Sequence, residues 1–161
     1  MEERKERFLE IMEQNEQLIR KVCFMYSRDE EHFKDLYQEA VANLWQGMES
    51  FRGEAKLSTW VYRTCINSCV TFFRRNNRYD GNRTSLDGML EPEADTTDRT
   101  SQLKMMYEMI SQLSDINKAI ILMWLDERSY DEISAVTGLT RNNVASRLRR
   151  IKLYLSKQAD Y

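Results

Sequence analysis

The sequence predicts an all-α protein made of two small helical domains joined by a flexible linker. Apolar residues recur at intervals of three and four along most of the chain, and no segment shows the alternation typical of a half-buried strand. Residues 80–100 hold the only proline and two of the five glycines and have no sustained apolar period. We therefore divide the chain into residues 1–79, a linker at 80–100, and residues 101–161. A long surface loop within one domain is the alternative.

The first domain is predicted to begin with two helices. Apolar residues of the first recur at helical spacing: Phe8, Ile11, Met12, Leu18, Ile19, Val22 and Met25. The second should run from about Glu30 to Glu49, with Phe33, Tyr37, Ala40, Leu44 and Met48 on its apolar side. Its other side carries a polar strip flanked by Trp45: Asp35, Gln38, Glu39, Ala42 and Gln46. This strip suits basic side chains of a partner protein, and a solvated acidic face is equally consistent with the pattern.

A glycine-containing loop and a third helix complete this domain. The loop is expected at Phe51–Lys56, and Ser58 is expected to cap a helix that ends near Asn76. Arg63, Asn67 and Arg74 fall near one side of this helix, and the other side is shared by Val61, Thr64, Cys65, Ser68 and Phe72. Basic groups mixed with aromatic rings suit single-stranded nucleic acid, although most of these rings are expected to lie in the core.

The second domain is predicted to hold a helical scaffold followed by a helix-turn-helix. The scaffold residues are Leu103, Met106, Ile110, Leu113, Ile120, Ile121 and Trp124. Ser129 can cap a helix that reaches Thr137, Gly138 can take the left-handed turn, and Thr140 can cap the last helix.

The last helix is predicted to be amphipathic, with a side suited to DNA. Val144, Leu148, Ile151 and Leu155 stack on the side that should face the core. The opposite side holds Asn142, Ser146, Arg149 and Arg150, with Arg141 and Arg147 toward its edges. The two-helix motif favours DNA binding over a surface helix whose arginines are only solvated.

Composition narrows the class of protein. The chain has 161 residues with 42% hydrophobic and 31% charged side chains, which is ordinary for a soluble domain. No apolar run is long enough to span a bilayer and the N-terminus is too charged for a secretory signal, so we expect a cytoplasmic protein without membrane insertion.

Cys23, Cys65 and Cys69 lack metal-site spacing and are expected to be buried thiols. We expect no metal, no cofactor, no small-molecule substrate and no enzymatic activity, because no catalytic motif is present.

Charge alternates along the chain although its net value is −2. Residues 1–50 carry 7 basic and 12 acidic side chains, and residues 84–127 carry 3 and 9. In contrast, residues 51–83 carry 7 basic and 2 acidic side chains, and residues 128–161 carry 7 and 3. Two separated basic blocks indicate two contacts with nucleic acid.

These motifs together resemble the extracytoplasmic-function sigma factors of the bacterial sigma-70 family. The resemblance rests on the order of Asp-x-x-Gln-Glu, Phe-Arg-Gly, Ser-Thr-Trp-x-Tyr-Arg and a terminal helix-turn-helix, and it spans nearly the whole chain. It implies that residues 1–79 are sigma region 2, which binds core RNA polymerase and the minus-ten promoter element. Residues 101–161 would be sigma region 4, which binds the minus-thirty-five element. It also implies promoter melting, a stress or envelope regulon, and control by an anti-sigma factor.

The resemblance assigns roles by position. The residues expected to contact polymerase are Asp35, Gln38, Glu39 and Trp45. The resemblance implies that residues 51–56 form the loop that captures a flipped base. It implies contacts with minus-ten DNA by Phe51, Arg52, Gly53, Lys56, Trp60, Arg63, Asn67, Arg74 and Arg75. It implies contacts with minus-thirty-five DNA by Thr140, Arg141, Asn142, Asn143, Ser146, Arg147, Arg149 and Arg150.

Two departures from the family pattern limit what it implies. Thr140 to Asn143 replace the more usual start of the recognition helix, and Cys65 and Cys69 stand where small aliphatic residues are common. The preferred promoter sequence therefore does not follow from the chain.

Three hypotheses compete with a sigma factor: a repressor or activator that uses the last helix alone, a helical adaptor protein, and an enzyme with a site around His32 and Cys23.

Overall fold

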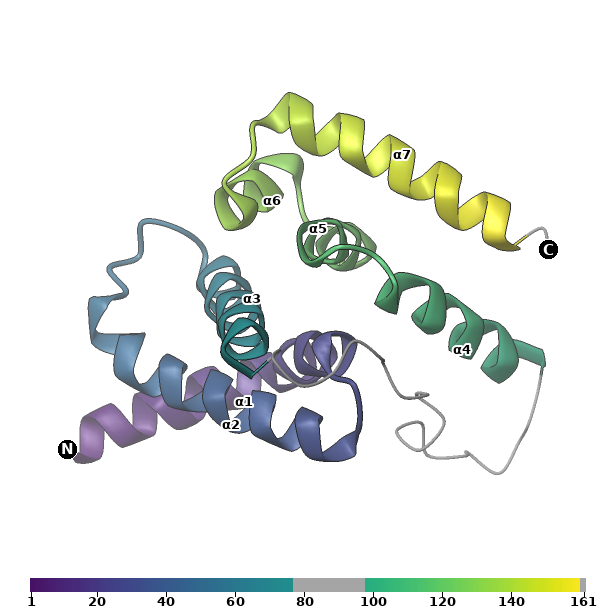
Figure 1. Ribbon diagram of the computed structural model, residues 1–161. Helices are drawn as coiled ribbons and strands as arrows, with labels where there is room; N and C mark the ends of the chain where they lie inside the picture. The colour runs from purple at the N-terminus through teal and green to yellow at the C-terminus, as the bar shows by residue number, and fades with distance from the viewer. Residues whose placement is uncertain (77–97, 160–161) are drawn as a thin grey trace. The chain divides into compact units, whose positions relative to one another are not determined.

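The computed structural model describes residues 1–76 and 98–159, and all the regular elements within these ranges are helices (Figure 1). This confirms the all-α prediction for the described part of the chain. The elements are α1 (Glu2–Tyr26), α2 (Glu30–Gly47), the 3-10 helix η1 (Met48–Ser50), α3 (Leu57–Asn76), α4 (Asp98–Ser111), α5 (Asp115–Leu125), α6 (Tyr130–Thr137) and α7 (Arg141–Ala159). Among these helices, none combines the length and apolar character needed to cross a bilayer.

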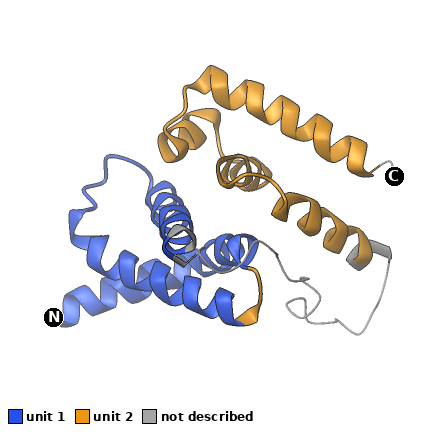
Figure 2. Ribbon diagram, in the orientation of Figure 1, with its two compact units in different colours: residues 1–27, 31–82 blue, residues 28–30, 83–161 orange. Residues whose placement is uncertain are grey.

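The chain divides into two compact units (Figure 2). Residues 1–27 and 31–82 form the first unit, and residues 28–30 and 83–161 form the second. The predicted linker at 80–100 lies outside the described residues except at its end, because α4 already begins at Asp98.

The first unit has its core where α1 and α3 pack against each other, and α2 contributes buried side chains to this core. The fully buried side chains of α1 and α2 include Ile19, Val22, Leu36, Ala40 and Leu44, and those of α3 include Val61, Tyr62, Cys65 and Cys69. Burial of each large apolar side chain contributes about 1.5–3 kcal/mol to folding, so this seam fixes the positions of the three helices.

The buried side of α2 is rotated from the predicted one. Phe33 and Tyr37 are only half-buried, whereas His32 and Leu36 join Ala40 in the core. The two aromatic rings instead contact each other, with centroids 6.0 Å apart, and Arg20 of α1 lies over Tyr37. Asp35, Gln38, Ala42 and Gln46 of the polar strip are exposed, whereas Glu39 is half-buried.

The third helix begins two residues earlier than expected, because a cap at Ser58 would make Thr59 the first helical residue. α3 starts at Leu57, and the Lys56 carbonyl accepts the first helical hydrogen bond from the Trp60 N–H at 3.1 Å. Ser58 therefore lies inside the first turn, and the prediction that it caps the helix is wrong. The loop at residues 51–56 and the helix end at Asn76 are as predicted.

The second unit is built around α5. Six consecutive residues of this helix, from Lys118 to Met123, are buried where α5 packs against α6 and α7. Ile110 of α4 is also fully buried. Leu103 was predicted to belong to the scaffold, but it is 45% exposed and this prediction is wrong. The Lys152 ammonium of α7 lies over the Trp124 ring, 4.0 Å from its centroid.

Local capping chemistry shapes the helix-turn-helix as predicted. The Ser129 hydroxyl accepts from the Glu132 N–H at 3.1 Å, and Gly138 ends α6 with a φ of 78°. The Thr140 hydroxyl then accepts from the Asn143 N–H at 3.1 Å and caps α7. Each cap satisfies an N–H that has no partner within its helix, so the turn is specified by residues close in sequence.

Candidate functional site

A small pocket opens between the 51–56 loop and the start of α3. Its volume is about 320 Å³, and its lining consists of Ser50, Phe51, Arg52, Glu54, Ala55, Trp60 and Arg63. The Phe51 and Trp60 rings contact each other with centroids 5.3 Å apart and planes inclined by 36°. Aromatic faces take unstacked bases and nearby guanidinium groups attract the phosphate backbone, so this composition suits a single-stranded segment.

Two glycines shape the walls of this pocket. Gly53 adopts a φ of 77°, which a residue with a side chain rarely takes, and this turns the loop back toward α3. A Cβ on Gly47 would lie 3.4 Å from Cζ2 of Trp60, so Trp60 rests closely on the end of α2. Ser50, Glu54 and Ala55 also line the pocket and were not among the predicted site residues.

The structure brings together some of the predicted minus-ten residues and separates others. Phe51, Arg52, Trp60 and Arg63 share the pocket lining, and Gly53 and Lys56 belong to the same loop. Asn67 is exposed one helical turn beyond Arg63. The side chain of Arg74 lies outside the described part of the structure.

Arg75 turns toward the acidic strip of α2. Its Nη2 atom lies 2.7 Å from Oε1 of Glu39, in an ion pair whose side chains are 59% and 31% exposed. One turn along α2, Asn43 donates to the Ser68 hydroxyl of α3 at 2.8 Å. A residue expected to bind DNA is thus paired with a residue expected to bind polymerase.

The remaining predicted polymerase contacts differ in how they are held. Asp35 and Gln38 are exposed on α2, as the polar strip requires. Trp45 is half-buried under α1, where the Phe8 ring meets it edge-on at 5.1 Å and the Arg4 guanidinium lies 4.3 Å from its centroid. Arg4 also donates to the Trp45 carbonyl at 3.1 Å, so this ring is fixed before any partner arrives.

The second basic surface is the outer side of α7. Val144, Leu148 and Ile151 are buried against the unit, and Leu155 is half-buried. The predicted DNA residues on the opposite side are exposed: Thr140, Arg141, Asn142, Asn143, Ser146, Arg149 and Arg150. Arg141 also lies 3.6 Å from the Asp131 carboxylate of α6 in an exposed ion pair. The helix therefore presents the amide, hydroxyl and guanidinium groups that read base edges and phosphates.

Arg147 is the exception on this helix because it is half-buried and points back toward α5. Its Nη1 atom donates to Oδ1 of Asn117 at 3.2 Å, and its Nε atom donates to Oδ1 of Asn143 at 3.2 Å. Asn117 was missed by sequence reasoning because its partner lies 30 residues further along the chain.

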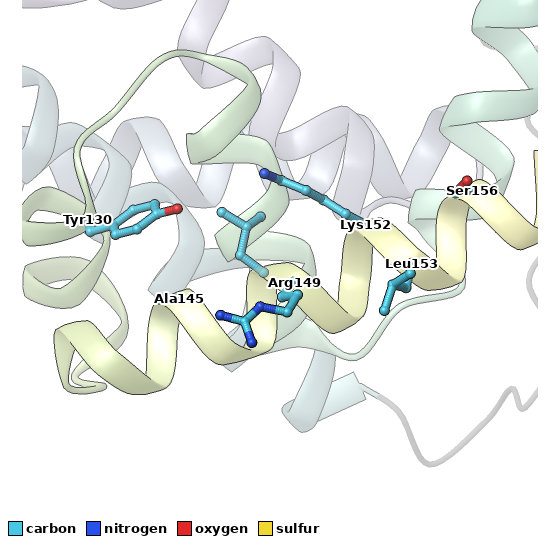
Figure 3. A pocket seen from close by; sticks show the side chains of 7 residues that line it. Tyr130, Ala145, Arg149, Lys152, Leu153 and Ser156 are labelled. Atoms are coloured by element: carbon cyan, nitrogen blue, oxygen red, sulfur yellow. The ribbon is translucent and has the colours of Figure 1, made fainter.

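A groove of about 610 Å³ runs beside the outer side of α7 (Figure 3). Tyr130 of α6 closes one end, and Arg149, Lys152 and Leu153 line it from α7. Arg149 therefore has space around it that a nucleic acid or protein group can enter.

The three cysteines lie inside the first unit as buried thiols. Cys23, Cys65 and Cys69 are all buried, and burial raises the pKa of the Cys65 thiol well above its usual value. A reactive cysteine needs a lowered pKa and exposure, which is the opposite environment. Within residues 1–76 and 98–159, no group of three His, Cys, Asp or Glu side chains is placed to hold a metal ion.

Comparisons with known proteins match the two units in order. The family model described as Sigma-70 region 2 matches residues 11–79, and the one described as Sigma-70, region 4 matches residues 103–155. The RNA polymerase sigma factor YlaC of Bacillus subtilis is 28% identical over 130 residues, which cover 77% of this chain and 75% of that protein. The ECF RNA polymerase sigma-E factor of Escherichia coli K12 is 27% identical over 135 residues, covering 73% and 69%. Among solved structures, the sigma factor RpoE of Bartonella quintana, crystallised with the anti-sigma factor NepR, shares the fold with a TM-score of 0.77 at 19% identity, covering 99% of this chain and 98% of that one.

Proposed function

From the premise that this chain belongs to the extracytoplasmic-function group of the sigma-70 family, we propose that it directs bacterial core RNA polymerase to its promoters and helps open them. The observation that carries this proposal is the order of the two family matches, each on a unit that presents a basic, nucleic-acid-suited surface. Residues 1–79 bind polymerase and the minus-ten element, and residues 101–161 bind the minus-thirty-five element.

Polymerase binds the polar strip of α2. Asp35, Gln38 and Glu39 offer carboxylate and amide groups to a basic partner surface, and charge-assisted hydrogen bonds of this kind are short and strong. Trp45 flanks the strip with a ring already oriented by Arg4 and Phe8. Binding therefore loses little side-chain freedom at this position, which favours affinity.

Promoter opening falls on the pocket beside α3. A base that leaves the duplex loses its stacking, at a cost of a few kcal/mol, and the Phe51 and Trp60 rings offer a replacement surface. Arg52 and Arg63 lie at the same cavity, where their charges favour the backbone of the separated strand. The protein captures the open state in this way while the polymerase carries out the chemistry, and it needs no catalytic activity of its own.

Recognition of the upstream element falls on α7. A helix of this type enters the major groove with its N-terminal residues on the base edges. Thr140, Asn142, Asn143 and Ser146 occupy that part of the helix, and Arg149 and Arg150 follow on the same exposed side. The capped, electropositive N-terminus of α7 favours a phosphate in addition.

The protein works in the cytoplasm, where its polymerase is found, and an anti-sigma protein controls it. The support for this partner is the shared fold with RpoE of Bartonella quintana, which was crystallised with the anti-sigma factor NepR. A partner that covers the α2 strip would block polymerase binding directly.

The direct test is run-off transcription by bacterial core polymerase, with and without this protein, on genomic promoter fragments. We expect transcripts from a few discrete start sites that depend on the protein. If the protein does not bind core polymerase at all, the proposal is wrong and a repressor or an adaptor becomes the better explanation.

A second arm tests base capture at the pocket. Trp60→Ala should lose transcription from duplex promoters and regain most of it on templates that carry a pre-opened, mismatched bubble. Trp60→Phe keeps an aromatic face and serves as the matched control, which should retain activity on both templates. An equal loss for Trp60→Ala on duplex and pre-opened templates would argue against base capture.

A further inference from the structure

Arg147 links the recognition helix to the scaffold of the second unit. Its guanidinium group spans Asn117 on α5 and Asn143 on α7, with both hydrogen bonds at 3.2 Å. The group is planar and holds its donors in a fixed fork, so two acceptors together define its position. Both acceptors are neutral amides, so the positive charge of Arg147 is not cancelled by either of them.

Asn117 is well placed to act as a fixed anchor. It lies in the first turn of α5, where its backbone N–H donates to the Ser114 hydroxyl that caps the helix. The next residues of α5, from Lys118 to Met123, are buried, so the backbone that carries Asn117 belongs to the most buried helix of the unit. The backbone that carries its side-chain oxygen is therefore held by the cap at Ser114 and by the buried residues of α5.

Asn143 is exposed on the side of α7 that faces away from the core. Its side-chain oxygen accepts from Arg147, which must donate, so the amide cannot exchange its oxygen and nitrogen without losing this bond. An asparagine that is free to flip can present donor and acceptor in either order to a base pair. One that is held presents a single pattern, and discrimination between bases depends on that pattern.

We propose that Asn117 is a positioning residue for promoter recognition: it holds Arg147, and Arg147 fixes the amide orientation that Asn143 presents to one base pair. This inference rests on the proposed function, because it requires α7 to read the minus-thirty-five element. Asn117 itself touches no base. It acts on specificity at a single position of the element through two successive hydrogen bonds.

The test measures base preference with the full-length protein in reconstituted holoenzyme, on promoters with a randomised minus-thirty-five element. Asn143→Ala identifies the base pair that Asn143 reads. We expect Asn117→Ala to reduce discrimination at that same base pair by about 3- to 10-fold, the effect of losing one net hydrogen bond. Asn117→Asp keeps an acceptor oxygen and should restore the wild-type preference.

Two further variants separate positioning from general stability. Arg147→Lys keeps the charge but lacks the planar fork that holds two acceptors in fixed positions, so it should shift preference at the same base pair as Asn117→Ala. Asn142→Ala is the matched control, because it removes a neighbouring exposed amide that makes no bond with Arg147 and should alter a different position.

The outcomes distinguish this inference from the function on which it rests. If wild-type holoenzyme selects no minus-thirty-five sequence, the proposed role of α7 fails. If wild type selects a sequence and Asn117→Ala keeps the same preferences, or weakens every position equally, then only the positioning role is overturned.

Discussion

The ion pair between Glu39 and Arg75 leads to a quantitative prediction about free and polymerase-bound protein. The two side chains meet at 2.7 Å, yet we propose that Glu39 binds polymerase and Arg75 binds DNA. Glu39→Gln removes the carboxylate charge and keeps the size of the side chain. The remaining amide oxygen holds Arg75 more weakly than the carboxylate does, so Arg75 becomes more available to a DNA phosphate, as it would be when polymerase engages Glu39.

The structure limits how large each effect can be. Because the pair is 31% and 59% exposed, its loss should lower the free energy of unfolding by only about 0.2–1 kcal/mol. One additional phosphate contact should steepen the dependence of log K on log salt by about 0.7 for a single strand or about 0.9 for a duplex. The change in salt dependence is therefore the clearer signal.

The assay is fluorescence anisotropy of a forked promoter fragment with free protein between about 50 and 200 mM salt. Glu39→Gln should bind more tightly with a steeper slope, and the double variant Glu39→Gln with Arg75→Gln should behave like Arg75→Gln alone. Asp35→Asn is the control, because it removes the same charge from the strip without a bond to Arg75. Additive effects of the two substitutions, or an equal gain for Asp35→Asn, would refute the idea that Glu39 holds Arg75 away from DNA.

Three further predictions concern the second unit and the buried thiol. Gly138→Ala should lower the free energy of unfolding by about 1–2 kcal/mol in urea denaturation, because φ is 78° while a Cβ would meet nothing within 4 Å. An unchanged stability would show that the turn adapts. Arg149→Ala should weaken binding to the preferred minus-thirty-five element by about 1–3 kcal/mol without lowering the melting temperature; a uniform loss on all sequences would indicate a phosphate contact instead. Burial raises the pKa of Cys65, so the folded protein keeps this proton at a pH where the unfolded chain loses it. The contribution of Cys65 to the free energy of unfolding should therefore change little below about pH 9 and fall as pH rises further, and a Cys65→Ala variant whose stability falls just as steeply there would contradict this account.

The parts of the fold that sequence reasoning predicted well are those set by local chemistry. Ser129, Gly138 and Thr140 shape the helix-turn-helix through hydrogen bonds and backbone angles that involve residues at most four positions away. The apolar spacing of α7 likewise predicted the burial of Leu148 and Ile151. Such features need no knowledge of the rest of the chain.

Distant contacts account for what was missed. The buried side of α2 differs from the prediction because α1 and α3 both cover this helix, and a three-to-four spacing fits Leu36 as well as Tyr37. The partners of Arg147 and Arg75 lie 30 and 36 positions away, so no local pattern indicated that one guanidinium would turn inward and the other toward an acid. Exposure alone did not decide which charged side chains are available to a ligand.

The three tryptophans of the chain lie at three places with different proposed partners. Trp45 lies under Arg4 beside the polymerase strip, Trp60 lies at the aromatic pocket, and Trp124 lies under Lys152 in the second unit. The protein thus contains its own fluorescent probes. Variants that keep one tryptophan and replace the other two by phenylalanine would report polymerase docking, base capture and upstream recognition as separate signals, so that the order of these events during initiation becomes measurable without an attached dye.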